Sequence, residues 1–82
     1  MLYAKFMYPE SGLHADIETA KMASLEVGKK YVVEDVCMGG WFTDIYLKGF
    51  DEAFNSVQFE FEEGGESIDI YSDPRYNPYM YM

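Results

Sequence analysis

Reactive side chains are scarce in this chain of 82 residues, which has one cysteine, Cys37, and one histidine, His14. A single cysteine excludes an intramolecular disulfide, and one Cys with one His cannot complete a Cys/His zinc site. Nucleophilic catalysis needs a cysteine or serine beside a base, and no spacing in the sequence brings Cys37 and His14 together. The carboxylates lack the loop pattern of a calcium site. We therefore expect no catalytic residue, no metal and no cofactor, and predict that the protein is not an enzyme.

Basic residues are also few: six Lys and Arg stand against fifteen Asp and Glu, for a net charge of −9. From Gly49 to Pro74 there are eight carboxylates and no Lys or Arg. Without a basic patch, direct binding to nucleic acid is disfavoured, because such binding depends on neutralising phosphates. A basic protein surface is the favoured partner, through long-range attraction. Solubility alone explains the same charge equally well, since an acidic surface keeps a protein in solution.

Targeting segments are missing as well. The N-terminus has no basic segment followed by an apolar run, so no signal peptide is predicted. No apolar run approaches the roughly 18 residues that cross a membrane. We expect a cytoplasmic protein, of a bacterium or of a phage-infected host cell, with no membrane partner.

Apolar and aromatic side chains are plentiful, at 49% and 18% of the residues. This composition favours a dense core over disorder, and the length fits one domain. We predict a single β domain over residues 1–75 and an aromatic tail over residues 76–82. The tail either folds back and buries Tyr76 and Tyr79, or stays free as a recognition segment or a dimer contact.

The most regular pattern is a predicted β-hairpin from Ser56 to Tyr71. Apolar and polar residues alternate strictly on both sides of Gly64-Gly65, and two glycines suit a two-residue hairpin turn. This turn sets a register in which Glu63 faces Glu66 and, further out, Glu60 faces Asp69. The predicted inner face consists of Val57, Phe59, Phe61, Ile68 and Ile70.

The rest of the chain predicts three more strands and one short helix. The strands cover residues 2–7, 29–38 with a bulge at Glu34-Asp35, and 41–47. A helix is expected over residues 13–24, although the segment is also compatible with a loop that contains one helical turn. Residues 49–55 read as a connection. On the strand 41–47, one face is predicted to hold Trp41, Thr43, Ile45 and Leu47.

The spacing Leu25-x-Val27-Gly28-x-x-Tyr31-x-Val33 resembles the strand entry of SH3-like β-barrels found in small bacterial and phage proteins. The resemblance covers residues 25–71 and implies a fold without an activity. The expected fold class is therefore mainly β (α+β): a small, five-stranded, strongly bent antiparallel barrel with one short helix. The aromatic groove of peptide-binding SH3 domains has no residue-by-residue counterpart here.

We interpret the acidic face of the hairpin as a binding surface for a basic protein, including a nucleic-acid-binding protein. In size and charge the chain is similar to phage inhibitors that mimic DNA, such as anti-CRISPR proteins. The predicted partner-binding residues are Glu60, Glu62, Glu63, Glu66 and Asp69 in place of phosphates, Asp51, Glu52 and Asp73 extending the field, and Tyr46 and Tyr71 as anchors.

The alternative hypothesis is a structural or assembly protein. In that case the aromatic tail and an open sheet edge would build a homo-oligomer, in the simplest case a homodimer. Salt dependence separates the two hypotheses, because charge mimicry weakens steeply with salt and apolar association does not.

Overall fold

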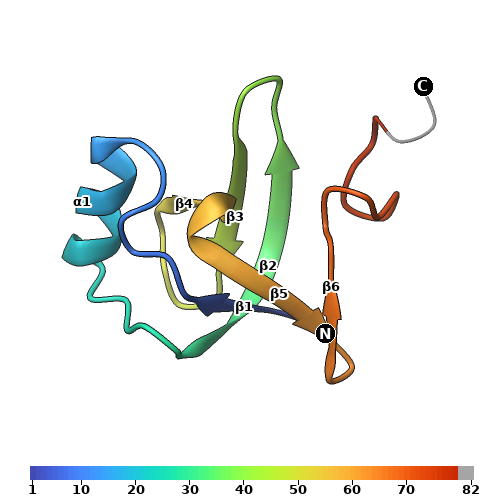
Figure 1. Ribbon diagram of the computed structural model, residues 1–82, viewed down its shortest axis with the longest axis horizontal. Helices are drawn as coiled ribbons and strands as arrows, with labels where there is room; N and C mark the ends of the chain where they lie inside the picture. Colours follow the sequence, from blue (N-terminus) through green and yellow to red (C-terminus); the bar gives the residue numbers. More distant parts are fainter. Residues whose placement is uncertain (80–82) are drawn as a thin grey trace.

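A computed structural model describes residues 1–79 and shows one antiparallel sheet of six strands with one α-helix (Figure 1). The strand order is β4-β3-β2-β1-β5-β6. The elements are β1 (Leu2–Phe6), α1 (His14–Met22), β2 (Lys30–Met38), β3 (Thr43–Leu47), β4 (Ala53–Asn55), a 3₁₀ turn η1 (Ser56–Gln58), β5 (Phe59–Glu63) and β6 (Glu66–Ile68). The prediction of a small, mainly β protein with one short helix is confirmed.

The first strand of the sequence, β1, lies at the centre of the sheet. It pairs with β2 on one side, where Tyr3 is opposite Val32, and with β5 on the other, where Ala4 is opposite Phe61. Leu2, Ala4 and Phe6 are buried, as the alternation of an amphipathic strand requires. The outer side of β1 therefore faces solvent between two neighbouring strands.

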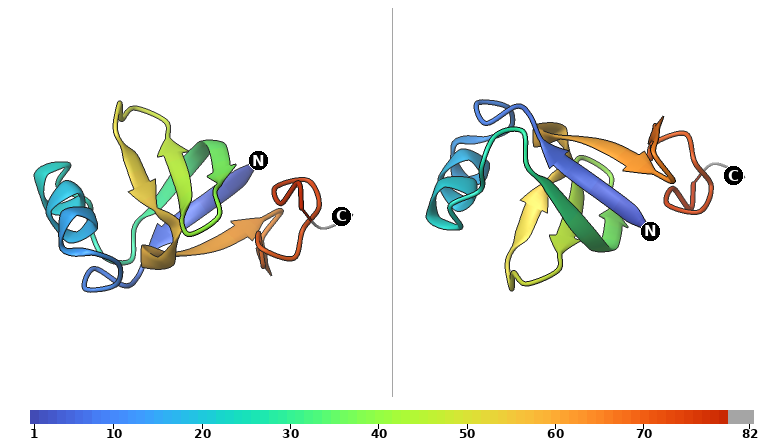
Figure 2. Two further views of the ribbon diagram at one scale, coloured as in Figure 1. Left: turned by 90° about the horizontal axis from the view of Figure 1, so that it is seen from above. Right: turned by 90° about the horizontal axis from the view of Figure 1, so that it is seen from below.

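The long strand β2 pairs with β1 on one side and with β3 on the other, and it contains the predicted bulge. Its register with β3 shifts between Val33 and Asp35, which inserts Glu34 as the extra residue. Val33 and Val36 both pack against the core as a result. Beyond the bulge, β2 and β3 form a hairpin arm that rises from the body of the molecule (Figures 1 and 2).

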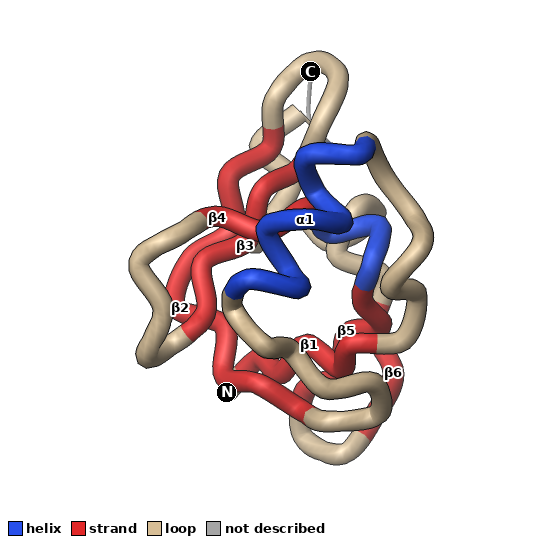
Figure 3. Tube along the Cα trace, turned by 90° about the vertical axis from the view of Figure 1, so that its left-hand side faces the viewer, coloured by secondary structure: helices blue, strands red, loops and turns tan. Residues whose placement is uncertain are grey.

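Helix α1 lies at one end of the sheet (Figure 3). Asp16 stabilises its start by accepting a hydrogen bond from the backbone N–H of Leu13 at 2.8 Å. Ala20 is the one buried residue of the helix, whereas Leu13, directly before its first turn, is exposed. Within residues 1–79, no helix has both the length and the apolar character needed to cross a membrane.

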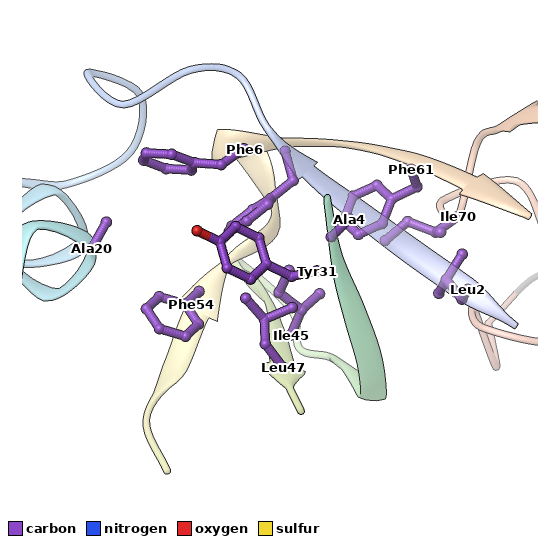
Figure 4. Packing of buried hydrophobic residues seen from close by; sticks show 11 residues of the cluster. Leu2, Ala4, Phe6, Ala20, Tyr31, Ile45, Leu47, Phe54, Phe61 and Ile70 are labelled. Atoms are coloured by element: carbon purple, nitrogen blue, oxygen red, sulfur yellow. The ribbon is translucent and has the colours of Figure 1, made fainter. Parts of the chain in front are cut away.

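The core is a row of aromatic rings filled in by aliphatic side chains. Phe50 meets Tyr31 and Phe54 edge-to-face, each at 5.7 Å between ring centroids, and Phe54 meets Phe59 at 6.4 Å. Figure 4 shows Ala20 at the α1 side of this cluster and Ile70 at the opposite end.

The predicted five-stranded barrel is wrong in strand number and in closure. The two outermost strands, β4 and β6, pair on one side only, so the sheet is open and the SH3-like closure is not found in the described residues. The strand β6 stops at Ile68 because Asp69 turns the chain away. Its carboxylate accepts hydrogen bonds from Tyr71 N at 3.0 Å and from Ser72 Oγ at 2.9 Å.

Two segments differ locally from their predicted strands. Residues 56–58 form η1 because the side chain of Asn55 accepts a hydrogen bond from Val57 N at 3.2 Å. Val57 is consequently exposed and Gln58 buried, the reverse of the prediction. Trp41 is also exposed instead of buried, since it lies in the loop at the tip of the arm.

Candidate functional site

The acidic hairpin has its predicted turn at Gly64-Gly65, but the strand register predicted further from the turn is wrong. Both glycines have positive φ, at 62° and 83°, and the register pairs Glu63 with Glu66. Glu60, however, does not face Asp69, which lies beyond the end of β6. Glu60 faces Lys5 of β1 instead.

The acidic face of β5 is paired with lysines. Lys30 Nζ lies 2.6 Å from Glu62 Oε1, reaching across β1. Glu60 has Lys5 opposite it and accepts a hydrogen bond from the Tyr8 hydroxyl at 3.0 Å, which raises the pKa of that tyrosine. The expectation that this surface has no cation nearby is therefore wrong, because β1 and β2 supply cations from the other end of the sequence.

A second group of carboxylates shares Arg75 as its cation. Its guanidinium lies 2.7 Å from Glu63 and 2.6 Å from Asp73. The pKa of Glu63 is lowered, first by the hydrogen bond from the Tyr76 hydroxyl at 2.9 Å and then by Arg75. The pKa of Asp73 is lowered by its hydrogen bonds with Arg75. These contacts hold the segment after β6 against the end of β5.

The aromatic tail begins within this same cluster. Tyr76 is half-buried against the core, and Asn77 donates a hydrogen bond to the carbonyl of Tyr71 at 2.6 Å. Tyr79 remains exposed. Tail residues Met80, Tyr81 and Met82 lie outside the described part of the chain.

The other predicted binding residues are distributed over different parts of the molecule. Glu66 is exposed at the β5–β6 turn, and Asp51 and Glu52 are exposed in the β3–β4 connection. The hydroxyl of Tyr71 lies 2.6 Å from the Ser56 hydroxyl, so one edge of that ring is engaged internally. Tyr46 lies on the outer face of β3. The ten predicted residues therefore do not form one surface.

A more compact acidic surface lies on the arm, where the sequence-based prediction placed only Tyr46. Asp35 of β2 is opposite Tyr46, and Cys37 is opposite Asp44, all four on the outer face. With Glu34 at the bulge, the arm carries three carboxylates, none of which forms an ion pair within residues 1–79. We call the outer face of β2 beyond the bulge and of β3, together with the tip, the arm surface.

The tip of the arm presents two aromatic rings to solvent. Gly39 N donates a hydrogen bond to Phe42 O at 2.8 Å, which closes a tight loop around Gly40 and Trp41. Trp41 is 94% exposed and Phe42 is 50% exposed. The signal for this was the Gly39-Gly40 pair directly before an aromatic dipeptide, since residues in a two-residue loop cannot also face the core.

Catalytic or metal-binding geometry is not found in the described residues. Cys37 is exposed on β2, and His14 at the start of α1 lies 3.9 Å from Glu18. Within residues 1–79, no group of three His, Cys, Asp or Glu side chains is placed to hold a metal ion.

Comparisons with known proteins connect the chain to phages. No curated protein and no solved structure matches it. The model of the family described as bacteriophage T4 protein Y07B matches residues 1–82, and the chain therefore belongs to this phage protein family.

Proposed function

We propose that the chain is a non-catalytic protein-binding module, a small acidic inhibitor or adaptor that engages a basic protein surface by charge mimicry in the cytoplasm of the phage-infected cell. A nucleic-acid-binding protein is the partner class that such mimicry fits best. One observation carries the proposal. Three exposed or half-exposed carboxylates of the arm surface form no ion pair within residues 1–79: Glu34, Asp35 and Asp44.

The position of the charge differs from the one expected from sequence. Glu62, Glu63 and Asp73 are matched by Lys30 and Arg75, so their field outside the molecule is weakened. The arm has no such internal cations along its length, and Lys48 lies only at its base. Its carboxylates can therefore contribute to steering and to charge complementarity with a partner.

Exposed aromatic side chains on the same surface support binding over solubility alone. Trp41, Phe42 and Tyr46 all present large rings to solvent beside these carboxylates. Tryptophan and tyrosine are enriched among the residues that dominate binding energy at protein interfaces, and an acidic surface needed only for solubility has no use for them.

A salt-dependent capture experiment tests the proposal. The tagged chain is used to isolate proteins from lysate of the phage host at low and at high salt, and the partners are identified. We expect a basic protein whose capture falls steeply with salt and is lost in the double variant Asp35→Lys, Asp44→Lys. The matched control, Glu10→Lys with Glu66→Lys, makes the same change in net charge on exposed residues away from the arm. Neutral or acidic partners only, or equal loss in both variants, would contradict the proposal.

Homo-oligomerisation is the second candidate, and the exposed ring of Tyr79 favours it. Deletion of residues 77–82 should then convert an oligomer to a monomer with little dependence on salt. Size measurement of both forms at low and high salt separates this candidate from charge mimicry, which predicts a monomer in each case.

A further inference from the structure

The arm contains a length of β2 with a strand neighbour on one side only. β1 pairs with β2 through Lys30, Tyr31 and Val32. From Asp35 to Met38, the described residues pair β2 only with β3. This part of β2 is therefore an open strand edge in the interior of the strand order, next to the start of β1.

The hydrogen-bonding groups on this edge follow from the ladder. Gly39 and Phe42 form a hydrogen-bonded pair, and such pairs alternate along an antiparallel ladder. Cys37 and Asp35 are then bonded to β3, whereas the N–H and C=O groups of Val36 and Met38 point to the open side. A side-chain contact supports this orientation of Val36: its N–H donates a hydrogen bond to the Asp35 carboxylate at 2.8 Å.

A groove runs beside the same edge. Its volume is about 390 Å³, and it lies between β2, the start of β1 and the segment after β6. Leu2, Val33, Val36 and Tyr76 supply apolar lining, and Met1, Glu34, Asp35, Glu63 and Arg75 complete it, with Arg75 held by its ion pair with Glu63. Figure 1 shows the chain after β6 running beside β2. The groove offers room for the side chains of one more strand.

We propose that this edge binds an extended segment of a partner protein as an added β-strand, with apolar and basic residues alternating along it. Backbone hydrogen bonds to Val36 and Met38 would hold the segment, and its alternate side chains would enter the groove. Its outward side chains would lie beside Asp35 and Glu34, which is the reason to require Lys or Arg there. The basic character of the partner rests on the proposed function.

Asp35 gives the site a reason to prefer a basic segment. In the free protein its carboxylate occupies the N–H of Val36 and so blocks the edge. A lysine or arginine opposite Asp35 draws the carboxylate away and releases this N–H for the incoming strand. A second copy of the chain would bring its own edge of acidic residues and no Lys or Arg between Tyr31 and Leu47, so it lacks the basic positions that the site requires.

A displayed library of random heptapeptides, selected against the full chain, tests this inference. We expect enriched peptides with alternating apolar and basic positions, and slowed amide hydrogen exchange at Val36 and Met38 when they bind. The variant Met38→Pro removes the outward N–H without breaking a bond to β3, and an edge strand tolerates proline in that orientation. Met38→Ala is the matched control, because it also loses the side chain but keeps the N–H. Proline should lower affinity about tenfold or more relative to alanine, while both variants keep the far-UV spectrum of the folded chain.

Several outcomes would overturn the inference. Failure to enrich an alternating sequence, or equal binding by the proline and alanine variants, would exclude strand addition at this edge. Self-association that proline abolishes and alanine retains would assign the edge to a second copy. The proposed function fails separately: salt-sensitive capture of a basic partner that survives Met38→Pro leaves charge mimicry intact and removes only the added strand.

Discussion

Arg75 shows how a single residue determines which carboxylates of this protein remain without a cation. It is the only cation after Lys48, and it binds Glu63 and Asp73. Two of the carboxylates that the sequence predicts to be unpaired share this one cation, so their combined charge is halved. The hydrogen bond from Tyr76 to Glu63 adds to the cluster and ties the end of the chain to β5.

This cluster predicts acid sensitivity. The folded pKa values of Glu63 and Asp73 lie below their ordinary values of 4.5 and 3.8, so the unfolded chain binds more protons in this range. The stability that they contribute is present above pH 4.5 and is lost as the pH falls through the folded pKa values. The free energy of unfolding, measured with urea from pH 7 to pH 3, should therefore decrease, and Glu63→Gln should flatten the curve. Glu10→Gln, on an exposed residue away from the cluster, is the control and should leave the slope unchanged.

Gln58 is a buried polar residue whose replacement by an apolar side chain should cost the fold little stability. It is fully buried, and its Oε1 has no hydrogen-bond partner within the described residues, while its Nε2 donates to Pro9 O at 3.2 Å. An unpartnered buried oxygen costs about 1–3 kcal/mol, which offsets the gain from the Nε2 bond. Gln58→Met should therefore change the free energy of unfolding by less than about 1 kcal/mol. Gln58→Glu buries a charge and should cost roughly 3 kcal/mol or more; urea unfolding at neutral pH compares the two, and a large loss in the Met variant would contradict the prediction.

At the scale of elements, α1 depends on a single carboxylate for its attachment. Asp16 accepts from Leu13 N and also from the side chain of Asn55 in β4 at 3.0 Å, so one residue both starts the helix and joins it to the sheet. Asp16→Ala should lower stability by about 1–2 kcal/mol, because it removes the start of the helix and leaves the buried amide of Asn55 without this partner. Glu18→Ala, on the exposed side of the same helix, should change it by less than about 0.5 kcal/mol. Thermal unfolding of the two variants measures the difference.

The arm has a buried face that stabilises the fold and an exposed face that we propose binds the partner. Mutations on the two faces test these roles separately. Trp41→Ser should change the free energy of unfolding by less than about 0.5 kcal/mol, since the ring is 94% exposed. The same variant should reduce capture of the basic partner, if Trp41 is an anchor. Ile45→Ala is the contrasting variant. Its side chain is fully buried, and its loss should cost about 2–5 kcal/mol.

For the whole molecule, local patterns in the sequence predicted individual elements better than their assembly. The alternation around Phe59 and Phe61, the bulge at Glu34 and the turn at Gly64-Gly65 were all recognisable, because each depends on neighbours in sequence. The failures concern contacts between distant segments. Nothing near Glu62 in sequence indicates that Lys30 lies beside it, since that contact exists only once β1 has paired on both sides.

The predicted binding residues do not form one uncompensated surface for the same reason. A stretch of sequence without Lys or Arg suggests that its carboxylates have no cation nearby. In the folded sheet, the same carboxylates lie beside lysines from β1 and β2. The arm, with fewer carboxylates, keeps its charge because β2 and β3 carry no Lys or Arg there and the neighbouring strand β4 contributes only Ala53, Phe54 and Asn55. Strand order, which the sequence does not reveal, therefore determines which acidic residues remain free to meet a partner.

The central position of β1 in the sheet also determines when the sheet can be completed during folding. Leu2 and Phe6 precede their partners Glu63 and Phe59 by more than fifty residues of sequence. One side of β1 therefore cannot pair until these later residues have been made. Long-range pairing of this kind slows folding relative to helical proteins of equal size. A chain that lacks β5 leaves one side of β1 unpaired and removes Phe59 and Phe61 from the core, so we expect it to be cleaved by proteases more readily than the folded chain.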